Sequence, residues 1–158
     1  MAGAVIALGA NLGDARAALA GAIEALRETA GIRVISESSV YVTAPVGGVE
    51  QPDYVNAVVT VETSLDPRQL LEVLHAIEDS WHRTREVRWG PRTLDLDLIQ
   101  YEGVTSDDPD LTLPHPRAHE RAFVLVPWFE ADPQAELQGF GAVAGLLASV
   151  GDQGITIA

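Results

Sequence analysis

The sequence contains no cysteine and no lysine, and its ten basic residues of the Lys and Arg types are all arginines. The absence of cysteine excludes disulfides, thiolate metal sites and a cysteine nucleophile. The absence of lysine excludes the lysine of a Walker-type phosphate loop, a Schiff-base lysine and a lysine general base. Arginine remains, and its planar guanidinium suits a bidentate contact with phosphate oxygens.

Long apolar runs are also absent. No segment approaches the ~20 residues that a membrane span requires, and the opening MAGAVIALGANLGD has no basic segment of the kind that begins a signal peptide. We therefore expect a cytoplasmic protein that does not bind a membrane. A length of 158 residues favours one domain, residues 1–158, with a core of its own. Because no exposed apolar seam is evident, we expect a monomer.

The charge balance is strongly negative. A formal net charge of −13 argues against a general nucleic-acid binder, because phosphate backbones are bound by basic surfaces. Six of the ten arginines nevertheless lie between positions 83 and 121: Arg83, Arg85, Arg88, Arg92, Arg117 and Arg121. Scattered surface ion pairs would be the simplest interpretation. The four arginines of residues 83–92 instead favour a site for an anionic group.

Hydrophobic periodicity predicts regular elements in the order β-α-β-β-α-β. We expect strands at 4–8, 32–43, 56–63 and 94–100, a helix after Asp14 with Leu19, Ile23, Leu26 and Ala30 on its apolar face, and a second helix that buries Leu70, Leu74, Ile77 and Trp81. Asp66, Pro67 and Gln69 have the spacing of an N-cap, a first-turn proline and a capping-box partner. The order is typical of the ferredoxin-like α+β fold, an antiparallel sheet with two helices on one face.

The remaining segments are predicted to be loops and C-terminal helical additions. Residues 44–54 contain two prolines and two adjacent glycines, which predicts a fairly long loop. Beyond Tyr101 we expect an acidic loop, the segment LPHPRAHERAF, a short apolar segment around Pro127 and a helix near 141–150.

Two carboxylates interrupt the apolar strand at 94–100. Because side chains two apart in a strand point to the same side, Asp95 and Asp97 project together while the leucines between them face the core. Adjacent ionised carboxylates repel each other unless a positive charge lies between them. Magnesium supplies such a charge and prefers a few carboxylates with waters and substrate phosphates. A solvated edge strand is the alternative, but the neighbouring arginines favour a metal and phosphate site.

Other candidate site residues lie on both sides of this strand. His115 stands between two prolines, where it is either structural or a donor to phosphate. Tyr54 and Asn56 close the loop at 44–54, and Phe123 follows Arg121. Aromatic faces and an amide can stack on and hydrogen-bond to a planar heterocycle, although aromatic residues at strand ends more often belong to a core.

The segment RWGPRTLDLDLI, residues 88–99, resembles the signature of the 6-hydroxymethyl-7,8-dihydropterin pyrophosphokinase family of the folate pathway. The segments LGANLGD, YVTAPVG, QPDYVNAVV, SWHRTREVRWGPRTLDLDLI and LPHPRAHERAFVLVPWFE fall in the order and spacing of that family, so the resemblance covers nearly the whole chain. It implies transfer of the β,γ-diphosphoryl group of ATP to the hydroxymethyl oxygen of the pterin, with release of AMP.

The resemblance also implies a role for individual residues. Asp95 and Asp97 would hold two magnesium ions and, with Arg83, Arg85 and Arg92, would form the catalytic group. ATP would contact Glu78, Arg85, Arg88, Trp89, Arg92, Leu98, Thr112, His115 and Arg121. The pterin would contact Thr43, Ala44, Val46, Tyr54, Asn56, Trp89 and Phe123. Three positions depart from the better-known family members: His75, Asp110 and Pro116.

Three other functions are compatible with the same topology. A palm-type two-metal nucleotidyltransferase or cyclase would also place two aspartates on a ferredoxin-like sheet, but it would release pyrophosphate in place of AMP. A non-catalytic ligand-binding module would need no carboxylate pair beside four arginines. An RNA-recognition module is disfavoured by the negative charge.

Overall fold

The computed structural model describes residues 1–11, 14–43, 53–82, 94–151 and 153–158. Its first half contains β1 (Ala2–Ala10), α1 (Ala15–Glu28), β2 (Ile32–Glu37), β3 (Tyr41–Thr43), β4 (Tyr54–Thr63), α2 (Pro67–His82) and β5 (Asp95–Tyr101). The remainder contains β6 (Ser106–Asp108), β7 (Leu111–Leu113), the 3-10 helix η1 (Ala118–Glu120), α3 (Ala122–Ala131), β8 (Glu136–Leu137), β9 (Gly141–Ala142), α4 (Val143–Val150) and β10 (Thr156–Ile157).

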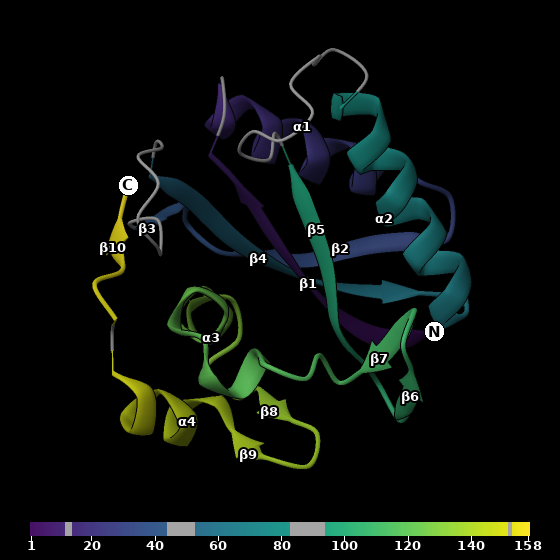
Figure 1. The fold of residues 1–158 in the computed structure, drawn as a ribbon. Coiled ribbons are helices and arrows are strands. Elements are labelled where there is room, and N and C mark those ends of the chain that lie inside the picture. The colour runs from purple at the N-terminus through teal and green to yellow at the C-terminus, as the bar shows by residue number, and fades with distance from the viewer. Residues whose placement is uncertain (12–13, 44–52, 83–93, 152) are drawn as a thin grey trace.

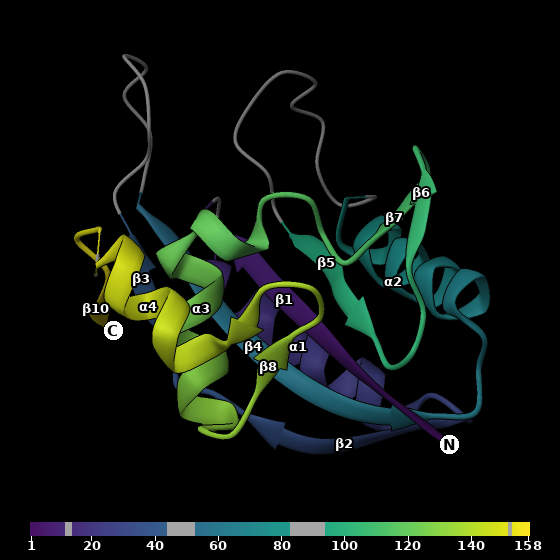
Figure 2. The ribbon, with the colours of Figure 1, turned by 90° about the horizontal axis from the view of Figure 1, so that it is seen from below.

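The main sheet has the strand order β10-β3-β4-β1-β5, and β2 pairs with the other half of β4. All of these pairs are antiparallel. Helices α1 and α2 cover one face of the sheet, α3 lies against the other face, and α4 packs beside α3 (Figures 1 and 2). This arrangement confirms the predicted ferredoxin-like fold with C-terminal additions. The additions close part of the face that the core motif leaves open.

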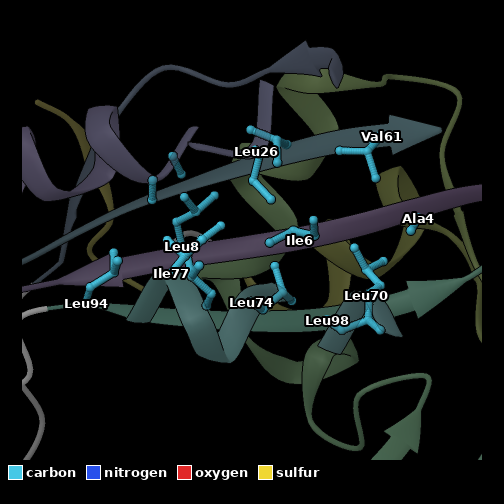
Figure 3. Packing of buried hydrophobic residues seen from close by; sticks show 14 of the residues in the cluster. Ala4, Ile6, Leu8, Leu26, Val61, Leu70, Leu74, Ile77, Leu94 and Leu98 are labelled. Carbon is cyan, nitrogen blue, oxygen red and sulfur yellow. The ribbon is translucent and has the colours of Figure 1, made fainter. Parts of the chain in front are cut away.

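The two faces of β1 belong to two different cores. Ala4, Ile6 and Leu8 pack in the cluster that includes Leu26 of α1 and Leu74 of α2. Figure 3 shows these side chains meeting between the sheet and the helices. Val5 and Ala7, which point the other way, pack in a second cluster with Trp128 of α3. Because side chains alternate along a strand, one central strand supports both layers.

Both predicted helix starts are confirmed. The Asp14 carboxylate accepts a hydrogen bond from the backbone N–H of Ala17 at 3.1 Å. At the start of α2, Gln69 N–H donates to Asp66 Oδ1 at 2.8 Å and Asp66 N–H donates to Gln69 Oε1 at 2.9 Å. This reciprocal pair satisfies two of the N–H groups that a helix start leaves without partners.

Four predicted elements differ in the structure. The acidic loop expected beyond Tyr101 contains the antiparallel pair of β6 and β7. The strand expected at 32–43 is divided into β2 and β3, because the Ser38 hydroxyl accepts the Val58 N–H at 2.9 Å and replaces a backbone carbonyl in the ladder. The apolar segment around Pro127 is the helix α3, which buries Val124, Leu125 and Trp128 despite its internal proline. The helix expected near 141–150 begins at Val143, because the two residues before it pair with β8.

Candidate active site

Asp95 and Asp97 lie on the face of β5 opposite the first core. Leu94, Leu96 and Leu98 are buried in the cluster with α1 and α2, whereas Asp95 is half-buried and Asp97 is exposed. The register places Asp97 beside Ala7 and Asp95 beside Gly9. The sequence therefore predicts the direction of both carboxylates correctly, because β5 keeps a two-residue repeat from 94 to 98.

A cavity of about 540 Å³, the first cavity, lies on one side of these carboxylates. It is lined by Leu71, His75 and Glu78 of α2, by residues 95–98 of β5, by residues 109–112, and by His115, Pro116 and Arg121. Five residues predicted for ATP line it: Glu78, Leu98, Thr112, His115 and Arg121. The three positions that depart from the family pattern, His75, Asp110 and Pro116, line it too.

Glu78 joins α2 to the carboxylate pair. Its Oε2 accepts the backbone N–H of Leu96, the residue between the two aspartates, at 2.8 Å. Burial raises the pKa of Glu78; the Leu96 hydrogen bond opposes this rise, and the nearby charges of Asp95 and Asp97 add to it. The charge of His75 lowers the pKa of Glu78, so burial, the largest cause, accounts for most of the net rise. Three carboxylates, those of Glu78, Asp95 and Asp97, line this end of the first cavity, which favours a bound cation.

His115 closes the other side of the first cavity. Its backbone N–H donates to the carbonyl of Ile99 at 2.7 Å, and its Nδ1 accepts the N–H of Arg117 at 3.2 Å. Burial lowers the pKa of His115, Asp97 opposes the change, and Arg121 and Arg117 reinforce it. A neutral imidazole whose Nδ1 accepts a hydrogen bond carries its proton on Nε2, so His115 can donate a hydrogen bond to an anion.

A second cavity of about 420 Å³ lies on the other side of the carboxylates. Four residues predicted for a heterocycle line it: Thr43, Tyr54, Asn56 and Phe123. Asn56 is 6 % exposed, and its Nδ2 donates to Thr43 Oγ1 at 3.0 Å. The guanidinium carbon of Arg121 lies 5.4 Å from the centroid of the Phe123 ring, within the range of a cation–π interaction.

The two cavities share Asp95, Asp97 and Arg121. Ligands in the two cavities would therefore meet at two carboxylates and one guanidinium. Magnesium uses one or two protein carboxylates and completes its shell with water and substrate phosphates, so the two aspartates fit this ion. The described residues contain no cluster of three or more His, Cys, Asp or Glu side chains suited to a metal held by protein groups alone.

Seven of the predicted site residues lie outside the described part of the chain: Arg83, Arg85, Arg88, Trp89, Arg92, Ala44 and Val46. The predictions for these positions accordingly stay predictions.

Several residues of the second cavity were not predicted: Ala7, Leu8, Gly9, Ala122, Gln153 and Ile155. Gln153 anchors the C-terminal segment there, because its Oε1 accepts the Ala122 N–H at 3.1 Å and its Nε2 donates to the Glu120 carbonyl at 3.1 Å. No local pattern marks Gln153 or Ile155 in the sequence. Gly9 lies inside β1, where a glycine often marks the close approach of a ligand or another backbone, but the strand expected from the sequence ended at residue 8.

A ferredoxin-like sheet with two adjoining cavities and a shared carboxylate pair defines a small-molecule-binding domain. Residues 5–133 match the family model of 7,8-dihydro-6-hydroxymethylpterin-pyrophosphokinase, and the chain belongs to this family. None of the helices among the described residues is long and apolar enough to cross a membrane.

Known proteins support the same assignment. The chain is 46 % identical over 152 residues to the 2-amino-4-hydroxy-6-hydroxymethyldihydropteridine pyrophosphokinase of Methylorubrum extorquens, covering 96 % of each chain. It is 44 % identical over 139 residues to the enzyme of the same name from Bacillus subtilis, covering 88 % of this chain and 83 % of that one.

Solved structures support the fold. The crystal structure of wild-type Plasmodium falciparum HPPK-DHPS with pteroate has a TM-score of 0.74 and 14 % sequence identity. The match covers 94 % of this chain and 44 % of that one, so the present chain spans less than half of the larger protein. At this identity the likeness shows the fold alone.

Proposed function

We propose that the protein transfers the β,γ-diphosphoryl group of ATP to the hydroxymethyl group of 6-hydroxymethyl-7,8-dihydropterin in folate biosynthesis. The hydroxymethyl oxygen bonds to the β-phosphorus of ATP, the bond from that phosphorus to the α,β-bridging oxygen breaks, and AMP leaves. The hydroxyl proton passes to solvent. Beyond the family match, the observation that carries this proposal is that two cavities share Asp95, Asp97 and Arg121.

In this proposal ATP occupies the first cavity and the pterin occupies the second. Tyr54 and Phe123 lie along the faces of the pterin ring, and Asn56 hydrogen-bonds to its edge. Thr43 holds the Asn56 amide in place through the hydrogen bond to its hydroxyl. Ring stacking and a fixed amide orient the hydroxymethyl group, which supplies much of the rate enhancement when two substrates react.

On the nucleotide side, Asp95 and Asp97 would hold two magnesium ions. Magnesium bound there would neutralise charge on the phosphate oxygens and make the β-phosphorus a better electrophile. Arg121 contributes a permanent positive charge from the wall between the cavities, and neutral His115 donates a hydrogen bond to a phosphate oxygen. By resemblance, Arg83, Arg85, Arg88, Trp89 and Arg92 would also act on the nucleotide.

A product assay tests the proposal. The protein is incubated with ATP, magnesium and 6-hydroxymethyl-7,8-dihydropterin, and AMP, ADP and pyrophosphate are separated by chromatography. We expect AMP to appear in step with pterin diphosphate, and only when both substrates and the metal are present. ADP would indicate transfer of a single phosphoryl group. Pyrophosphate would indicate a nucleotidyltransferase, and either product would contradict the proposal.

A further inference from the structure

Gly9 is one of the residues that the sheet contributes to the wall of the second cavity. In the sheet register it lies opposite Asn56 of β4 on one side and Asp95 of β5 on the other. It follows Val5 and Ala7 on the same face of β1, and it lines the second cavity together with Ala7. A residue at this position therefore touches the space between the amide and the carboxylate.

A side chain at Gly9 would meet atoms that cannot easily yield. A Cβ placed there would lie 3.2 Å from Asn56 Oδ1 and 3.8 Å from the carbonyl oxygen of Val55. The first distance is shorter than ordinary van der Waals contact. Asn56 has little room to move, because it is 6 % exposed and its Nδ2 is held by the Thr43 hydroxyl at 3.0 Å.

The backbone does not require glycine at this position. Gly9 lies within β1, and it is not among the glycines that adopt positive φ. Glycine weakens a strand interior relative to residues with side chains, so strand stability alone would favour another residue. The physical reason for a glycine here is therefore that a side chain would project into the second cavity and contact Asn56.

We propose that Gly9 is a specificity-determining residue of the second cavity. Its missing side chain sets the depth of the cavity, so that the edge of a planar heterocycle can lie against the Asn56 amide while its hydroxymethyl arm reaches the Asp95 carboxylate. This inference rests on the proposed function, because it takes the pterin as the occupant of the second cavity.

Gly3 supplies a matched control on the same strand. It lies six positions earlier and therefore on the same face of β1. A Cβ at Gly3 would lie 3.7 Å from Glu102 Oε1 and 4.0 Å from the Val61 carbonyl oxygen, both of which are ordinary contacts. Gly3→Ala therefore adds the same methyl group to the same strand without touching the second cavity.

The experiment compares the wild type with Gly9→Ala, Gly9→Val and Gly3→Ala. Pterin affinity is measured by ligand fluorescence, affinity for a non-hydrolysable ATP analogue by calorimetry, and folding by circular dichroism. We expect Gly9→Ala to weaken pterin binding about tenfold, which corresponds to about 1.4 kcal/mol. We expect Gly9→Val to abolish measurable pterin binding and Gly3→Ala to bind both ligands like the wild type. In Gly9→Ala the loss of nucleotide affinity should be smaller than the loss of pterin affinity, because Gly9 does not line the first cavity.

The outcomes show whether a failure concerns the role of Gly9 alone or the proposed function as well. A wild type that forms pterin diphosphate, with Gly9→Ala binding pterin as tightly as Gly3→Ala does, would overturn the inference alone. Equal losses of pterin and nucleotide affinity in Gly9→Ala would also overturn it. A wild type that neither binds nor turns over the pterin would overturn the proposed function and the inference together.

A second pair of variants covers the case in which Gly9→Ala does not fold. In Asn56→Ser the side-chain oxygen nearest the new Cβ is removed, so alanine at position 9 is relieved of its closest contact. We expect Asn56→Ser/Gly9→Ala to bind pterin about tenfold more weakly than Asn56→Ser alone, because the methyl group still occupies the cavity. Equal pterin affinities in this pair would overturn the inference.

Discussion

At the scale of single residues, Asp95 and Asp97 could be placed from the sequence and Gly9 could not. The direction of the two carboxylates depends only on the alternation of side chains in one strand, which is a local property. The importance of Gly9 depends on Asn56, which reaches it from another strand and is held there by Thr43. A single-sequence pattern gives the alternation but not the neighbour across the sheet.

Asp97 provides the test at this scale. Asp97→Ala should lower turnover by more than about 100-fold, because a metal contributes several kcal/mol of charge stabilisation and each 1.36 kcal/mol is a factor of ten. Asp97 is exposed, so the unfolding midpoint should stay close to that of the wild type. Turnover is measured as AMP release and folding by thermal melting. A folded Asp97→Ala protein with full activity would contradict the two-metal assignment.

At the scale of elements, the helix starts were predictable and the sheet interruptions were not. Asp14, Asp66 and Gln69 act on N–H groups within three residues, so their spacing in the sequence is sufficient. The break between β2 and β3 depends on a hydrogen bond from Val58 to Ser38, twenty residues apart in sequence. Helix α3 forms around Pro127 because its apolar residues are buried against the sheet, which local preference does not reveal.

Glu78 of α2 accepts a hydrogen bond from β5, and two substitutions distinguish the effect of this hydrogen bond from the effect of the negative charge. Glu78→Gln keeps an oxygen that can accept the Leu96 N–H, whereas Glu78→Leu leaves that N–H without its acceptor. We expect Glu78→Leu to destabilise the protein by about 1–3 kcal/mol and to weaken binding of a magnesium–nucleotide analogue, measured by calorimetry. Glu78→Gln should retain most of the stability.

Glu72→Gln is the matched control for Glu78, because Glu72 lies on the same helix and is exposed. It should leave both stability and nucleotide affinity unchanged. If Glu78→Leu and Glu72→Gln behave alike, Glu78 does not position β5.

A second contact between elements predicts how stability depends on pH. The Tyr41 hydroxyl of β3 donates to Glu130 Oε1 of α3 at 2.7 Å. Burial, the Glu130 hydrogen bond and the Glu130 charge together raise the pKa of Tyr41 from 10.0 to about 12. The folded state therefore holds the proton more tightly than the unfolded state. The resulting stabilisation is complete below pH 10.0 and is lost as the pH rises to about 12.

Urea unfolding across this pH range checks the Tyr41 prediction. The difference in unfolding free energy between the wild type and Tyr41→Phe should shrink as the pH rises, because only the wild type has this hydroxyl proton to lose. At acid pH the effect of Glu130 has the opposite sign. Burial raises the pKa of Glu130, but the hydrogen bonds from Tyr41 and Ser39 lower it by more, so the net pKa lies below the ordinary value of 4.5. The stability that ionised Glu130 contributes is therefore present above pH 4.5 and is lost as the pH falls below that value. A difference between wild type and Tyr41→Phe that does not change with pH would contradict the assignment.

At the scale of the whole molecule, the order of elements in the sequence was sufficient to predict the ferredoxin-like sheet. The two cavities were only partly predictable, since α3 and the segment around Gln153 approach the sheet from the C-terminal half of the chain. We propose that residues 1–158 form one domain and that the protein is a monomer. The two hydrophobic clusters share β1, so unfolding of one should expose the other.

The domain and assembly proposals are tested by light scattering and calorimetry. We expect a molar mass near 16.8 kDa and a single unfolding transition whose calorimetric and van't Hoff enthalpies agree. A mass twice as large would contradict the monomer, and two resolved transitions would contradict the single domain.

The outer edge of β5 has a consequence for solubility. β5 ends the strand order of the main sheet, and an open sheet edge can pair with a strand of another molecule and begin aggregation. Glu78 occupies the N–H of Leu96 on this strand, and the N–H of His115 occupies the carbonyl of Ile99. Two residues that line the first cavity thus also block the edge. A substitution of Glu78 made to change nucleotide binding will carry a risk of precipitation at high protein concentration, because it can free the Leu96 N–H. A substitution of His115 by any residue except proline keeps the backbone N–H that occupies the Ile99 carbonyl.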